Sequence, residues 1–137
     1  MSRIINLESA GKERTRLTRA IVLAVRELAR QNGTGAESRD LAAYIALSLR
    51  AIADTIDVSV AAWEKRGYWV KADRFRMDWL WAGELAEKLR LALLSEDWGT
   101  VAALAARSAQ KLNKVSVGEN NRLGKPWAGA WQELQRR

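Results

Sequence analysis

Five basic side chains share one face of the first helical segment that the sequence predicts. They follow one another at steps of three, four or seven residues, a spacing that places side chains on one side of a helix. They are Lys12, Arg16, Arg19, Arg26 and Arg30. Two pairs among them are like charges four residues apart, which mildly destabilises a helix. Phosphates of RNA or DNA would offset this repulsion, whereas a solvated face, or one paired with acidic groups of another helix, needs no such ligand. The basic face is therefore either a polyanion-binding site or a solvated surface.

Aromatic and basic side chains alternate in residues 63–76, around an expected helix junction. The aromatic members are Trp63, Tyr68, Trp69 and Phe75. Such rings stack on the bases of single strands while Lys and Arg hold the phosphates. The same composition suits a bundle corner that is sealed by aromatic rings, with Arg and Lys stems lying over their faces. The sequence favours the structural corner and leaves the binding site as the alternative.

No His and no Cys occur in the 137 residues. Their absence excludes Ser-His-Asp triads, thiolate nucleophiles, Cys/His zinc sites and His-ligated haem. The carboxylates do not suggest a di-metal centre, which needs Glu-x-x-His motifs on paired helices, and Asp54 is spaced for an ion pair with Arg50. A Gly-rich phosphate loop is also missing. We therefore expect no catalytic residue, no metal site and no cofactor, and a protein that is not an enzyme.

The chain is basic, with 23 Lys and Arg residues against 16 Asp and Glu residues and a net charge of +7. The excess lies in residues 1–31 and 111–137, around a nearly neutral middle. Basic ends suit an acidic partner, either a nucleic acid or an acidic protein. The longest charge-free runs have nine residues, about half of what a membrane span needs. We expect no membrane span and, because the start does not resemble a signal peptide, a cytoplasmic protein.

Apolar residues recur every three or four positions in four long segments, as in amphipathic helices. The segments cover about residues 9–33, 38–66, 68–94 and 95–115, with Ser9 and Ser95 as expected N-caps of the first and the fourth. Steps of three and four predict left-handed packing, and short connections make neighbours antiparallel. We therefore predict an all-α, antiparallel four-helix bundle that forms a single domain over residues 1–115.

The third segment is apolar almost all round. Trp79 lies on its main stripe, but Trp81 lies about 200° further around the axis, so the two indoles are not expected in the same core. Leu85 shares the Trp81 side, and Met77 and Leu80 lie on another side. A helix with several apolar sides needs a cover in so small a bundle. We expect residues 77, 80, 81 and 85 to form an oligomer interface, and the alternative cover is the C-terminal tail.

That tail consists of an expected loop, residues 116–125, and a short helix that Pro126 opens. Trp127, Trp131 and Leu134 lie on one face of this helix at positions i, i+4 and i+7. About ten residues that include Gly129 do not hold a helix alone in water. The tail is therefore expected to dock on the bundle or on a partner.

Two functions remain open from the sequence. The leading hypothesis is a small, non-enzymatic helical interaction module that self-associates as a twofold dimer. The alternative is a basic helical protein that binds RNA or DNA through the basic face of its first helix.

Overall fold

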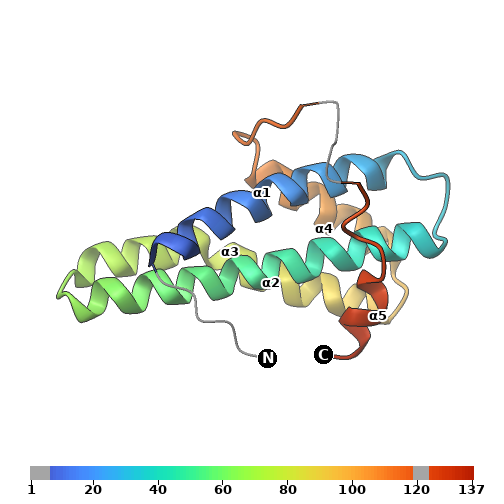
Figure 1. The fold of residues 1–137 in the computed structure, drawn as a ribbon. Helices are drawn as coiled ribbons and strands as arrows, with labels where there is room; N and C mark the ends of the chain where they lie inside the picture. The colour runs from blue at the N-terminus through green and yellow to red at the C-terminus, as the bar shows by residue number, and fades with distance from the viewer. Residues whose placement is uncertain (1–6, 119–123) are drawn as a thin grey trace.

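The protein is an all-α bundle in the computed structural model, which describes residues 7–118 and 124–137. These residues form five helices and no strand: α1 (Leu7–Ala29), α2 (Ala36–Lys65), α3 (Trp69–Leu94), α4 (Trp98–Lys111) and α5 (Ala130–Gln135). The first four are long and pack against one another (Figure 1). The fold class predicted from the sequence is thus confirmed.

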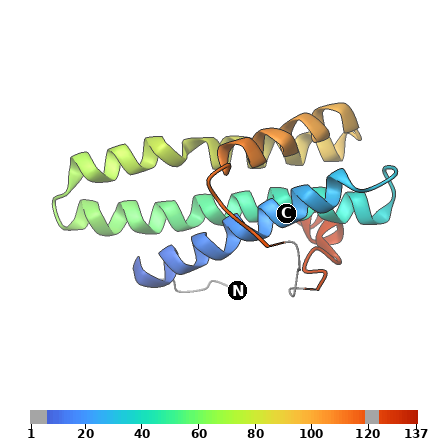
Figure 2. The same cartoon turned by 90° about the horizontal axis from the view of Figure 1, so that it is seen from above.

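The helices differ in length, and this leaves one end of the bundle less covered than the other. Helix α2 packs against α1, α3 and α5, and α4 packs against α3 and α1. Helix α4 has 14 residues and α2 has 30, so α4 spans about 21 Å and α2 about 45 Å at 1.5 Å per residue. Figure 2 shows α4 along the C-terminal half of α3 only. The α2–α3 hairpin therefore extends beyond both α1 and α4 (Figures 1 and 2).

The apolar stripes predicted for the four long helices form the core. Ile21 of α1, Ile45 and Ile52 of α2, Leu89 of α3 and Val101 of α4 are all fully buried or nearly so. Burying such a side chain stabilises the fold by about 1.5–3 kcal/mol. Packing of the stripes against one another therefore holds the four helices together.

Helix ends differ from the predicted ones at two caps. Ser9 lies inside α1, and α4 is capped by Asp97 rather than Ser95. The Asp97 carboxylate accepts hydrogen bonds from the backbone N–H and the hydroxyl of Thr100, at 3.2 and 2.6 Å. Glu96, which lies between Ser95 and Asp97, adopts a left-handed φ of 57°. Helix α4 also ends at Lys111, earlier than predicted.

The C-terminal helix α5 lies on α2. Trp127 and Leu134 are buried, and the Trp127 indole N–H donates to Glu37 of α2 at 3.4 Å. Helix α5 begins at Ala130 and not at Pro126, because residues 126–129 form a turn that ends in Gly129 with φ 81°.

Asp40 of α2 holds the start of α5. Its carboxylate accepts the backbone N–H groups of Gly129 and Trp131, at 3.3 and 3.0 Å. The half-buried Trp131 ring lies 5.9 Å from the Arg39 guanidinium. A side chain from a neighbouring helix thus supplies the cap that this short helix lacks in its own sequence.

None of the helices in residues 7–118 and 124–137 is long and apolar enough to cross a membrane.

Candidate functional site

The tip of the α2–α3 hairpin, residues 63–76, is shaped by the way α2 ends. Gly67 has a φ of 83°, the left-handed conformation that glycine adopts without strain. Its N–H donates to the Glu64 carbonyl, and the Tyr68 N–H donates to the Trp63 carbonyl at 2.9 Å. This is the Schellman pattern of helix termination. It turns the chain within three residues and places Tyr68 and Trp69 at the end of the molecule.

An alternating row of cations and aromatic rings lies on the inner side of the tip. The Lys71 ammonium lies 4.6 Å from the Trp63 ring, whose edge meets Phe75 at 4.8 Å. The Arg14 guanidinium of α1 lies 4.8 Å from Phe75 and 6.0 Å from Trp79. These rings are half-buried and pack against the core. On this side the sequence alternation serves as a structural corner.

Arg14 is a cation without a carboxylate partner in the described part of the chain. It donates to the Ser59 hydroxyl at 2.9 Å and to the Thr55 carbonyl at 3.3 Å, while its buried Nε has no hydrogen-bond partner. Partial burial lowers the pKa of the Arg14 guanidinium from its ordinary value, yet arginine stays charged at neutral pH. The sequence reading missed this residue. Its spacing with Leu17 and Ile21, at i, i+3 and i+7, was the signal that it faces inward.

The outer side of the tip is exposed. Tyr68, Trp69 and Val70 all project to solvent, and Trp69 is 63% exposed. An exposed indole at the end of a helix hairpin leaves much apolar surface in water. Val70 borders three open grooves, the largest of about 700 Å³, and Trp69 borders two of them.

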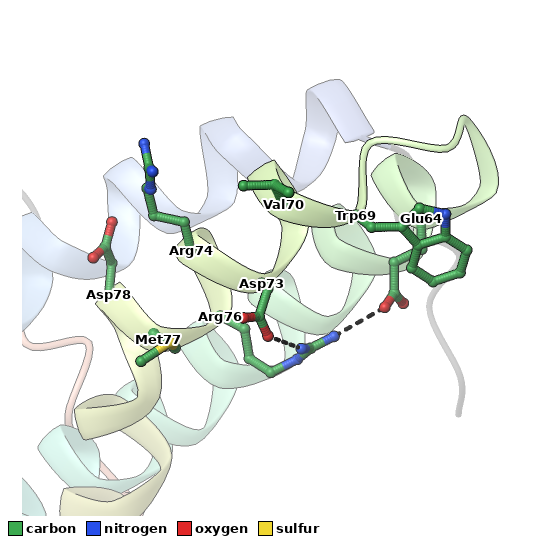
Figure 3. A pocket seen from close by; sticks show the side chains of 8 residues that line it. All are labelled: Glu64, Trp69, Val70, Asp73, Arg74, Arg76, Met77 and Asp78. Carbon is green, nitrogen blue, oxygen red and sulfur yellow. Dashed lines mark hydrogen bonds and ion pairs between the residues drawn. The ribbon is translucent and has the colours of Figure 1, made fainter.

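The charges around this outer surface are unevenly paired. Arg76 donates to Asp73 at 2.9 Å and to Glu64 at 3.1 Å and so occupies both carboxylates. Figure 3 shows Arg76 folded between them and Arg74 pointing to the other side of the groove. The described residues provide no acidic partner for Lys65, Arg66 or Arg74, which are all exposed. The outer tip therefore combines unpaired cations with exposed aromatic rings.

The basic face of α1 is more nearly neutral than its sequence suggested. Three of its five cations form ion pairs with carboxylates of α1: Lys12 with Glu8, Arg16 with Glu13, and Arg30, just after the helix, with Glu27. These local pairs offset the like-charge repulsion that the spacing of the basic residues creates. Acidic residues three or four positions away were the signal, and the sequence reading passed over them.

The other two cations of that face behave differently. Arg26 donates to the backbone carbonyls of Val117 and Gly118, at 3.2 and 3.1 Å, and so ties the segment after α4 to α1. Arg19 is exposed and has no partner among the described residues. Only one of the five candidate residues thus presents an unengaged charge.

The candidate interface on α3 is divided between exposed and buried residues. Met77 and Leu80 are 68% and 58% exposed, whereas Leu85 is 4% exposed. The Trp81 ring stacks on the Trp79 ring, with centroids 5.7 Å apart, and both are half-buried against the core. The expectation that the two indoles lie on different sides is wrong, because a side chain as long as Trp reaches around the helix. Leu85 does not belong to an exposed face, because its own chain covers it.

A separate cavity of about 310 Å³ lies between the end of α1 and the start of α4. Its walls include Val25, Leu28, Trp98 and Ala105, and no charged residue lines it. Ligand sites need a few polar groups that fix the orientation of the ligand. This cavity offers little of that kind, and we do not assign it a ligand.

The described residues contain no group of three or more Asp or Glu side chains that could hold a metal ion. Comparison of the chain with protein-family models, with curated protein sequences and with solved structures finds no match.

Proposed function

We propose that this protein is a helical interaction module that self-associates through the outer face of α3. The observation that carries the proposal is the position of α5. This helix packs against α2 and so leaves the outer face of α3 uncovered. Met77, Leu80 and Leu91 on that face are each more than half exposed. Clustered apolar surface on a small protein is characteristic of a contact site.

A second copy of the chain is the occupant that the face fits. Around a twofold axis between Leu80 and Trp81, two antiparallel α3 helices place Val70 of one copy opposite Leu91 of the other. The same axis places Asp73 opposite Lys88, and Lys88 has no ion pair among the described residues. These two pairs are complementary, as an isologous interface requires, whereas Met77 falls opposite the exposed Glu84.

The contact is small, since it is made mainly by one helix from each copy. Helix α3 has 26 residues and is about 39 Å long at 1.5 Å per residue. Interfaces below the standard size of about 800 Å² per partner are usually weak or transient. We therefore expect a dimer that dissociates in the micromolar range.

Sedimentation velocity over a concentration series tests the proposal. The wild-type protein is expected to shift from monomer to dimer by tens of micromolar, and Leu80→Glu is expected to remain monomeric, because it buries a charge in the contact. Ala103→Glu is the matched control: it adds the same charge on an exposed position of α4 and leaves the dimer intact. A wild-type protein that stays monomeric at tens of micromolar contradicts the proposal.

A further inference from the structure

The cations of this chain are not equally available to a ligand. On α1, three of the five candidate cations are held by carboxylates of the same helix and a fourth by backbone carbonyls. At the hairpin tip, Arg76 engages Glu64 and Asp73, and the exposed Asp78 lines the same groove as Arg74. Lys65, Arg66 and Arg74 form no ion pair among the described residues. The tip therefore offers more unpaired positive charge than α1.

Exposed aromatic rings lie beside these cations. Tyr68 and Trp69 are each more than half exposed, at the point where the chain turns from α2 into α3. Rings that only sealed the corner would face inward, as Trp63 and Phe75 do. The inner row of aromatic residues already closes the bundle here, so the packing of the core does not explain the two outer rings.

We propose that the outer tip of the α2–α3 hairpin is a binding site for single-stranded nucleic acid. Trp69 and Tyr68 stack on unpaired bases, and Lys65, Arg66 and Arg74 contact the phosphates. Stacking of this kind requires the flat face of a base to be accessible, and in a duplex the bases stack on one another instead. The combination of unpaired cations with exposed rings therefore selects a single strand over a duplex and over a simple anionic surface.

The centre of this site is separate from the centre of the proposed dimer contact, although Val70 and Asp73 belong to both regions. The dimer contact is centred on residues 80 and 81, and Trp69 lies three helical turns away along α3. Leu80→Glu is therefore expected to bind single strands with unchanged intrinsic affinity. Loss of binding in this variant would show that the two surfaces are one, and it would overturn the assignment of the tip as a separate site.

Fluorescence anisotropy with a labelled oligothymidylate and a labelled duplex of equal length tests the proposal. At about 50 mM salt we expect micromolar binding of the single strand, weaker binding of the duplex, and a log–log salt slope of about −2 for three phosphate contacts. Arg66→Glu removes one contact, so its slope falls by about 0.7 and its affinity by about tenfold at this salt. Trp69→Ala is expected to weaken binding at least about fivefold through lost stacking.

Arg19→Glu is the matched control for Arg66→Glu. It makes the same charge change at an exposed, unpartnered position on α1, and it is expected to change the affinity less than about threefold. Circular dichroism of each variant verifies that these exposed substitutions leave the helices intact. Equal losses for the two charge reversals, or full binding by Trp69→Ala, would show a diffuse charge effect and overturn the site. The site would also be overturned if the protein bound no oligonucleotide at tens of micromolar, or if it bound vesicles of anionic lipid as tightly as the oligonucleotide.

Discussion

Replacing Leu80 by alanine is expected to weaken the proposed dimer, and the exposed fraction of the Leu80 side chain determines by how much. The Leu80 side chain is 58% exposed, so the contact can still cover more than half of it. Burying a whole leucine side chain is worth about 1.5–3 kcal/mol, and covering this fraction is worth about 1–1.7 kcal/mol per copy. The alanine methyl group retains part of this burial energy. The two copies together therefore lose about 2 kcal/mol of binding free energy, which raises the dissociation constant about 30-fold.

Sedimentation equilibrium or light scattering over about 1–100 µM protein measures this change, because that range brackets a micromolar dissociation constant. Urea unfolding of the variant is the accompanying control. An exposed position on a single helix should change the free energy of unfolding by less than about 0.5 kcal/mol. A weaker dimer with unchanged fold stability therefore assigns the effect to the contact.

A dissociation constant that changes less than about threefold, in a protein that does dimerise, would refute the placement of Leu80 in the contact. Cysteine cross-linking then locates the axis, because the chain has no cysteine of its own. Leu80→Cys lies beside the proposed twofold axis and should form a disulfide-linked dimer under mild oxidation. Ala103→Cys on α4 is the control that should not.

Three further predictions concern the fold and the site. Leu89→Ala empties a fully buried position and should lower the free energy of unfolding by about 2–5 kcal/mol in urea; a loss under about 1 kcal/mol would mean that this stripe is not core. Hydrogen bonds from Thr100 lower the pKa of Asp97 from its ordinary 3.8, so its stabilising effect is present above that value and fades as the pH falls through the folded pKa. The difference in free energy of unfolding between the wild type and Asp97→Ala, measured by urea titration, should therefore be larger at pH 7 than at pH 2. An equal difference at the two pH values would refute this role of the Asp97 carboxylate. Arg14→Met keeps the contact with Phe75 but removes the partly buried charge that has no carboxylate partner, so its thermal midpoint should equal or exceed that of the wild type. Arg14→Ala also loses the contact and should have a lower thermal midpoint. A much lower thermal midpoint in Arg14→Met would show that the charge itself is stabilising.

The helices and their buried faces followed from local pattern alone. Residues three and four apart share a helix face whatever surrounds them, so the spacing of Leu41, Ile45 and Ile52 identified the core face of α2. Gly67 likewise marked the end of α2, since a left-handed residue stops a helix within the chain's own geometry. The ion pairs that offset the charge of α1, such as Glu13 with Arg16, were also readable from sequence, because the partners lie one turn apart.

Features that join distant segments were decided by tertiary structure. The conformation of the turn before α4 decided that Asp97 and not Ser95 caps this helix. The start of α5 is capped by Asp40, which lies 89 residues before Gly129. The stacking of Trp79 on Trp81 depended on long side chains leaning around a helix, which angles of the backbone do not reveal. The difference between a buried Leu85 and an exposed Leu80 arose because packing covers one side of α3, while α5 docks on α2 and leaves the outer side open. Helix periodicity states only which residues share a face, and the placement of neighbouring helices decides which of those faces is covered.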